Sequence, residues 1–194
     1  MHKRTLGSLA IMGVIGIAGV TPAVQATDAN RGNFIEKLAR AANPNLSTYQ
    51  NAAYKLSIQY PRTWRKQEQI MGLLVMFLSP KESNVDKFQE NLNILVRPLA
   101  RPATLAEATK LGTQQMKEML SDFKLISSKN TTLGNSPANQ IVFTGKQGKF
   151  NLKWMQTYTI KNKKIYVLTY TAEVGKYSTF LGTIQKTINS FRLN

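Results

Sequence analysis

The chain has 194 residues, with 26 Lys and Arg against 10 Asp and Glu, a formal net charge of +16, one histidine and no cysteine. The length predicts one domain with a hydrophobic core, and the charge favours a polyanionic partner. The composition excludes disulfides, thiolate metal sites, a lipid-modified cysteine anchor and catalysis by a Cys–His pair.

The first 26 residues have the pattern of a secretory signal peptide. A basic start at positions 2–4 precedes an apolar run, Leu6 to Val20, and the small-residue motif TPAVQA follows. The run is shorter than the roughly 20 residues of a membrane-spanning helix, although an uncleaved anchor is the alternative. We expect cleavage after Ala26 and export to the periplasm or the extracellular space, with no transmembrane segment after cleavage. Cleavage would remove His2, and with it Ser-His-Asp catalysis and ordinary zinc sites.

The next segment, residues 27–47, is predicted to be a lead with a short helix over 30–42, because an apolar stripe there precedes a proline. The stretch YKLSIQYPRTW, residues 54–64, then alternates apolar and polar side chains, which predicts a half-buried strand. Pro61 cannot donate to a sheet ladder and ends this strand, and we expect Trp64 to fold back over the strand end. The corner is either structural or a ligand site.

Two further strands and two helices are predicted. The nearly continuous apolar run Ile70–Leu78 predicts a strand covered on both faces, and the alternation over 91–97 predicts another that Pro98 ends. Thr104 and Glu107 form a capping box for a helix that continues to about Ser121. Apolar residues at spacings of three and four over 177–191 predict a second amphipathic helix.

Between these helices the pattern predicts a meander of antiparallel strands. We expect strands over 123–132, 139–144, 150–160 and 165–172, with turns over 133–137, 145–148 and 161–164. The last two strands carry large apolar side chains at both parities and need cover on both sides. The fold class predicted for residues 48–194 is therefore α+β, an α-β-α sandwich with an antiparallel sheet flanked by helices.

Positive charge is concentrated in the C-terminal part of the chain. Residues 123–194 contain 11 Lys or Arg and a single acid, Glu173. The turn with Lys161, Lys163 and Lys164 is the densest cluster and the predicted partner-binding site. About 12 strand residues, on the order of 40 Å, separate it from Lys146 and Lys149, so the two clusters cannot form one patch.

The predicted partner is an acidic protein surface or an anionic membrane or envelope component, because an exported protein seldom meets nucleic acid. A hairpin tip made polar for solubility is the alternative. No catalytic, cofactor or metal site is predicted. The segment KESNVD, residues 81–86, lacks the glycine and the closing glutamate of a calcium loop.

Five segments in order resemble the PsbP-like superfamily, which includes PsbP-related and DcrB-like exported proteins and, more distantly, PsbP of photosystem II. They are residues 54–64 with Tyr60, Pro61 and Trp64, then ENLNILV, TLGNSPANQIVFTG, KKIYVLTYTAE and INSF. The resemblance implies an α-β-α sandwich with an antiparallel sheet. It also makes Tyr60, Pro61 and Trp64 a structural signature at the corner after the first long strand.

The resemblance implies an accessory protein rather than an enzyme, and three hypotheses remain. The first is an exported, non-enzymatic accessory or partner-binding protein of the cell envelope. The second is an assembly or stability factor of photosystem II in the thylakoid lumen. The third is an enzyme, and a hydrolase would have to rely on paired carboxylates, a Ser–Lys pair or an oxygen-ligated metal. The lack of an anchoring cysteine, and of the N-terminal extension of plant PsbP, favours the first.

Overall fold

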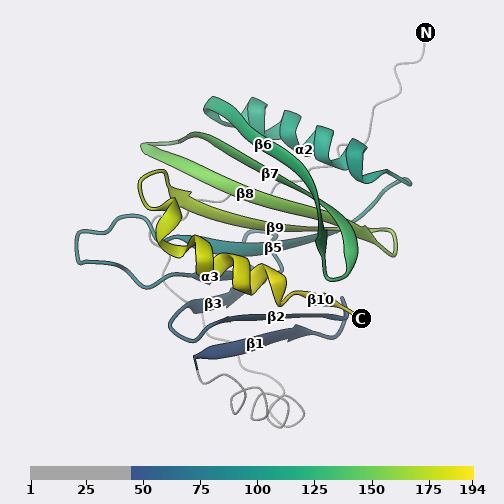
Figure 1. Cartoon of the computed structure of the whole chain (residues 1–194), viewed down its shortest axis with the longest axis horizontal. Coiled ribbons are helices and arrows are strands. Elements are labelled where there is room, and N and C mark those ends of the chain that lie inside the picture. Colours follow the sequence, from purple (N-terminus) through teal and green to yellow (C-terminus); the bar gives the residue numbers. More distant parts are fainter. Residues whose placement is uncertain (1–44) are drawn as a thin grey trace.

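The computed structural model describes residues 45–194, so the predicted signal peptide and the helix predicted over 30–42 lie outside the described residues. This part folds into a large sheet of order β3-β4-β5-β9-β8-β7-β6, a small sheet of order β1-β2-β10, and helices α2 and α3 (Figure 1). All paired strands are antiparallel. The elements are β1 Leu46–Asn51, β2 Leu56–Pro61, β3 Arg65–Glu68, β4 Val75–Leu78, β5 Asn91–Pro98, α2 Leu105–Met119, β6 Ser121–Leu133, β7 Ser136–Gln147, β8 Phe150–Lys161, β9 Lys164–Glu173, α3 Tyr177–Asn189 and β10 Arg192–Leu193.

The two helices cover opposite faces of the large sheet. Helix α2 packs on β6, β7 and β8, while α3 contacts β9 and also β2 of the small sheet. The predicted α+β class, with an antiparallel sheet flanked by helices, is therefore confirmed. The prediction lacked the small sheet, which shares one face of the large sheet with α3 (Figure 1).

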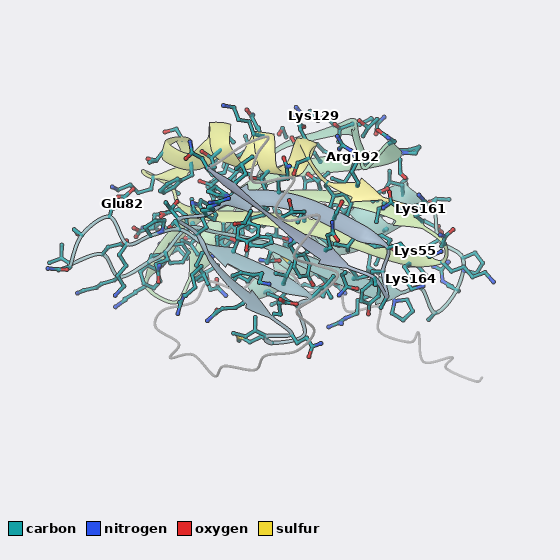
Figure 2. The ribbon with its side chains drawn as sticks, turned by 90° about the horizontal axis from the view of Figure 1, so that it is seen from below. Lys55, Glu82, Lys129, Lys161, Lys164 and Arg192 are labelled. Atoms are coloured by element: carbon teal, nitrogen blue, oxygen red, sulfur yellow. The ribbon has the colours of Figure 1, made fainter. Side chains whose placement is uncertain are left out.

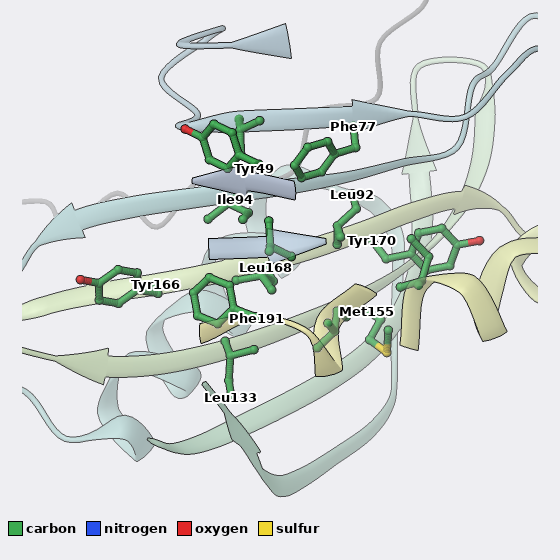
Figure 3. Close-up of a cluster of buried hydrophobic side chains, with 14 of the residues drawn as sticks. Tyr49, Phe77, Leu92, Ile94, Leu133, Met155, Tyr166, Leu168, Tyr170 and Phe191 are labelled. Atoms are coloured by element: carbon green, nitrogen blue, oxygen red, sulfur yellow. The ribbon is translucent and has the colours of Figure 1, made fainter. Parts of the chain in front are cut away.

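The hydrophobic core has two parts because the side chains of the central strands alternate between the two faces. Leu92 and Leu168 face the small sheet and α3, where they meet Tyr49 and Phe191 (Figure 3). Val167 belongs to the other part, on the side of α2. Strand β9 is buried along nearly its whole length, so the prediction that it is covered on both sides is confirmed.

Local signals predicted the helices well. The Thr104 hydroxyl accepts from the backbone N–H of Glu107 at 3.2 Å, and the Glu107 carboxylate accepts from the backbone N–H of Thr104 at 2.8 Å, so the capping box is present. Helix α3 ends at Asn189, and Phe191, expected on its apolar stripe, is instead fully buried just beyond the helix end.

The strand predicted over Ile70–Leu78 is wrong in its first half. Only Val75–Leu78 is strand, because Met71 and Gly72 have φ of 51° and 77° and form a loop that the Leu73 N–H closes on the Ile70 carbonyl at 2.8 Å. The chain reverses there so that β3 can pair with β4. Strand β3 reads RKQE and lies at the sheet edge, so no apolar pattern signals it.

The turns of the meander are shorter than predicted. Strand β7 includes residues expected in the turns over 133–137 and 145–148. Two residues, Gly134 and Asn135, connect β6 to β7, and two residues, Asn162 and Lys163, connect β8 to β9. All four have positive φ, which is the signature of a type I′ hairpin turn.

Candidate partner-binding surface

The turn between β8 and β9 presents the predicted lysines. Lys161 and Lys164 face each other as the last paired residues of the two strands, and Asn162 and Lys163 form the tip. The Lys163 side chain is exposed, whereas those of Lys161 and Lys164 are half-buried. The Lys163 carbonyl accepts from the backbone N–H of Leu99 at 2.9 Å, which connects the tip to the segment after β5.

The sequence predicted that all three lysine side chains project into solvent, but one of them does not. Lys161 Nζ donates to the Leu193 carbonyl at 2.9 Å, so this ammonium group connects the hairpin to β10. The prediction is wrong for Lys161 because β10, only two residues long and paired with β2, was not foreseen. Lys163 is therefore the best placed of the three to meet a partner.

Three cations from other segments reach the same end of the molecule. Arg97 lies opposite Ile165 next to the hairpin, Arg192 lies opposite Ser57, and the backbone carbonyl of Lys55 accepts from the Asn194 N–H at 2.9 Å. Their side chains are exposed. We define the basic end as Lys55, Arg97, Lys161, Lys163, Lys164 and Arg192. Figure 2 shows Lys55, Lys161 and Lys164 together at one end of the molecule and Glu82 at the other.

The sequence analysis missed Lys55, Arg97 and Arg192. Each is an isolated cation in its own segment, and only the pairing of β2 with β10 and of β5 with β9 brings it to the hairpin. No local pattern signals such a grouping. Among the described residues, the segments that form the basic end, 53–57, 97–99, 161–165 and 192–194, contain no Asp or Glu.

The acidic residues gather mostly at the opposite end, where cations are paired. Glu173 is the last residue of β9, and Glu82 accepts from Lys176 in an ion pair. Lys146 lies 2.7 Å from Asp122. The hydrogen bond to Asp122 raises the pKa of Lys146, and the hydrogen bond to Glu82 raises the pKa of Lys176, each above the ordinary value.

The other lysine cluster considered in the sequence, Lys146 and Lys149, differs from the basic end because its lysines contact other side chains of the protein. Lys146 and Lys149 lie where β7 meets the start of β8, and the hairpin lysines lie at the other end of β8, so the two clusters are separated as predicted. Lys149 lies over the Phe150 ring, with its Nζ 5.4 Å from the ring centroid. Lys146 and Lys149 therefore already have partners within the protein.

The corner residues are part of the packing. The Trp64 N–H donates to the Pro61 carbonyl at 2.9 Å, and its buried ring meets Phe180 of α3 edge-on at 5.5 Å. Tyr60 stacks on Phe77 with ring centroids 4.3 Å apart. This geometry agrees with a structural role for Tyr60, Pro61 and Trp64, and their role as a signature stays a prediction.

A shallow hollow of about 430 Å³ lies between α2 and the strands β6 and β7. Its charged lining residues are Lys110 and Lys117. Ser128, also in the lining, donates its hydroxyl to Asn139 Oδ1 at 3.3 Å. Within residues 45–194, no group of three or more His, Cys, Asp or Glu side chains could hold a metal ion, and neither helix has the length and apolarity to cross a bilayer.

A family model described as PsbP-like protein matches residues 7–193. Among solved structures, cyanobacterial PsbP (CyanoP) from Synechocystis is similar with a TM-score of 0.60 and 16% identity over 77% of this chain and 93% of its own. LpqN of Mycobacterium tuberculosis, involved in cell envelope biogenesis, has a TM-score of 0.59 and 12% identity over 77% and 90%.

The Ran-binding protein Mog1p of Saccharomyces cerevisiae has a TM-score of 0.54 and 6% identity over 77% of this chain and 95% of its own. None of the curated proteins matches the chain. At identities this low, the likeness to these structures shows a shared fold. The three structures come from proteins with different roles, so the fold does not define one partner.

Proposed function

Because the chain belongs to the PsbP-like protein family, we propose that it is an exported, non-enzymatic accessory protein of the cell envelope that binds an anionic partner through its basic end. The observation that carries the proposal is the gathering of six cations from four separate segments on a surface whose segments contain no acid. An unopposed positive surface steers an acidic protein or an anionic lipid surface toward it.

Backbone conformation supports a role for two of these lysines. Lys55 and Lys163 have φ of 50° and 57°, in the left-handed region that glycine adopts without strain. A lysine there costs about 1 kcal/mol or more relative to glycine. A side chain kept at a strained position suggests that its charge is used, because solubility alone could be met at an unstrained neighbour.

The residue content supports a non-enzymatic role. The chain has no cysteine, and its one histidine is His2, within the predicted signal peptide. Nucleophilic catalysis by triads or Cys–His pairs would therefore lack its base or its nucleophile. The predicted signal peptide supports export, and the likeness to LpqN, a protein of cell envelope biogenesis, supports an envelope location.

A lumenal role at photosystem II is the second candidate. The likeness to cyanobacterial PsbP over 77% of this chain favours it. The thylakoid lumen would then be the location, and the acidic partner would be a surface of the photosystem. The same basic end would make the contact in both cases, so the two candidates differ in partner and not in mechanism.

The test compares two double variants of matched charge. Lys163→Gln with Lys164→Gln neutralises the basic end, and Lys146→Gln with Lys149→Gln neutralises the opposite end by the same amount. Lys161 is left intact because its ammonium group holds the Leu193 carbonyl. Binding is measured by flotation with phosphatidylglycerol vesicles, and by cross-linking in cells from a photoreactive residue at position 162, which identifies an acidic protein partner.

We expect the basic-end variant to lose most binding in at least one of these assays at low salt, with the difference shrinking as salt rises. The opposite-end variant should bind nearly as the parent does. Both should unfold near the parent's temperature, because three of the four side chains are exposed and Lys164 is half-buried at the surface, where single charges contribute little to stability. Equal binding by the two variants in both assays would overturn the proposal.

Lys163→Gly separates charge from folding. Glycine relieves the left-handed strain, so this variant should be more stable than the parent and yet bind less. A gain in stability without a loss of binding would show that the tip charge has no role in recognition.

A further inference from the structure

Buried polar atoms without a hydrogen-bond partner are concentrated on one face of the large sheet. Among residues 45–194 they belong to Gln67, Asn91, Trp154 and Thr171. The register places all four in two neighbouring cross-strand rows. The first row runs Trp154, Thr171, Asn91 across β8, β9 and β5, and the second runs Gln156, Thr169, Asn93, Met76, Gln67 across β8, β9, β5, β4 and β3.

Both rows face the side of the sheet that α2 covers, because Trp154 and Met76 belong to the core cluster there. In the second row, several polar side chains are hydrogen-bonded to other protein groups. Gln156 Nε2 donates to Thr169 Oγ1 at 3.1 Å, and the Tyr158 hydroxyl donates to Gln156 Oε1.

In the first row, three neighbouring residues each have a polar atom without a hydrogen-bond partner in the protein. These atoms are Trp154 Nε1, Thr171 Oγ1 and Asn91 Oδ1. All three residues are 0% exposed. The Trp154 ring is stacked on Phe143, with centroids 5.2 Å apart, so its face is already covered while its N–H stays unpaired. Asn91 uses its amide Nδ2 toward the Gln89 carbonyl at 3.4 Å, which leaves its Oδ1.

Native proteins rarely leave three such groups unpaired, because each buried polar group without a partner carries its full desolvation cost. Residues directly opposite in an antiparallel pair have Cβ atoms about 4.5–5.5 Å apart. The side chains of the row therefore lie next to one another, and one water molecule with two hydrogen bonds of about 2.8 Å can bridge polar atoms up to about 5.6 Å apart. Internal waters in proteins typically bridge polar groups of this kind.

We infer that the row Trp154–Thr171–Asn91 is a binding site for two internal water molecules, one on each side of Thr171. The donors and acceptors then form a continuous chain. Trp154 Nε1–H donates to the first water, which donates to Thr171 Oγ1. The Thr171 hydroxyl donates to the second water, which donates to Asn91 Oδ1. Each group is used in a role that its chemistry allows.

The chemistry of the row selects a small, uncharged ligand. None of Trp154, Thr171 and Asn91 is ionisable at neutral pH, and neither is any member of the second row. The first row continues through Leu78 to Arg65, whose side chain is exposed at the sheet edge, so a metal ion or an anion among the three buried residues would find no counter-charge there. Glu90, the neighbour of Asn91, lies at the other parity of the chain and accepts from the Ser79 hydroxyl at 3.4 Å. Complete burial of the row leaves no entrance for a larger organic molecule.

The test uses the same substitution at two positions of β9 on the same face. Thr169→Val removes a direct hydrogen bond within the protein, and Thr171→Val removes a hydroxyl that only the two waters would satisfy. If the waters are bound, both variants lower the unfolding temperature, each by about 2–4 °C. If the row is dry, Thr171→Val removes an unpaired polar group, and its unfolding temperature stays the same or rises.

A direct measurement accompanies the thermal one. In NMR spectra of the purified protein, the indole N–H of Trp154 should show a cross-peak to long-lived water, and Thr171→Val should abolish it. Thr171→Ser keeps the hydroxyl and should retain the cross-peak. A parent without this cross-peak, a Thr171→Val variant at least as stable as the parent, or crystallographic density for an organic molecule in the row would each overturn the inference.

Discussion

Trp64 shows how one side chain can connect two layers of the molecule. It follows the strand end at Pro61 in a turn that its own backbone N–H closes, and its ring packs edge-on against Phe180 of α3. With 5% of its surface exposed, the ring is a core group at the junction between the small sheet and a helix near the other end of the chain. Its loss would leave a cavity where these layers meet.

We expect Trp64→Ala to lower the free energy of unfolding by about 3–5 kcal/mol. Trp64→Phe keeps an aromatic ring against Phe180 and should cost less. Chemical denaturation of the parent and both variants measures the effect. An alanine variant with unchanged stability but weaker partner binding would show that the corner is a recognition site.

Glu90 gives a pH dependence with a defined sign. Burial raises the pKa of this carboxyl above its ordinary value. The folded state therefore keeps the proton to a higher pH than the unfolded state, and stability falls as the pH rises from about 4.5 through the folded pKa. Glu90→Gln removes this loss, so its unfolding temperature should exceed that of the parent at pH 7.

Below the unfolded pKa the carboxyl is protonated in both states, and the advantage of Glu90→Gln should disappear there. Thermal unfolding from pH 4 to pH 8 measures the difference between the two proteins. A difference that grows on acidification would show that the buried carboxylate is stabilising and that the sign is wrong.

At the scale of elements, the sequence predicted those helices and strands whose ends are set by interactions between nearby residues. The capping box of α2 is set by Thr104 and Glu107, three residues apart, and both reciprocal hydrogen bonds are present. The strand predicted over 70–78 was too long, because an apolar composition gives no sign of a left-handed backbone. Gln69 and Met71 have this conformation and turn the chain before β4 begins. Strand β10 was missed because two residues carry no periodic pattern.

Thr104→Ala should lower the free energy of unfolding by about 1 kcal/mol, because it leaves the first turn of α2 without its side-chain acceptor. Thr104→Ser keeps the hydroxyl and is the matched control. The backbone N–H of Thr104 lowers the pKa of the Glu107 carboxyl, so the stabilisation by Glu107 is present above its unfolded pKa and is lost as the pH falls through the folded pKa. Equal stability of the alanine and serine variants would contradict this account.

At the scale of the whole molecule, the distribution of charge follows from strand pairing. The sequence shows an excess of lysine after residue 123 and a cluster in one turn. It does not show that Lys55, Arg97 and Arg192 join that turn, because those residues are brought there by pairings between distant segments. The lysine turn at the centre of the candidate surface could therefore be predicted, but the cations around it could not. Lys161, predicted to project into solvent, instead donates to the Leu193 carbonyl.

The small sheet also sets the order in which the protein can fold. Strand β2 finds one partner at once in β1, but its other partner is β10, and the Gln59 N–H that donates to Ser190 Oγ lies 131 residues earlier in the chain. Contacts between such distant segments slow folding, because a long loop must close before they form. The pairing of β2 with β10 therefore cannot form until residues 192 and 193 have been synthesised, whereas β2 can pair with β1 much earlier.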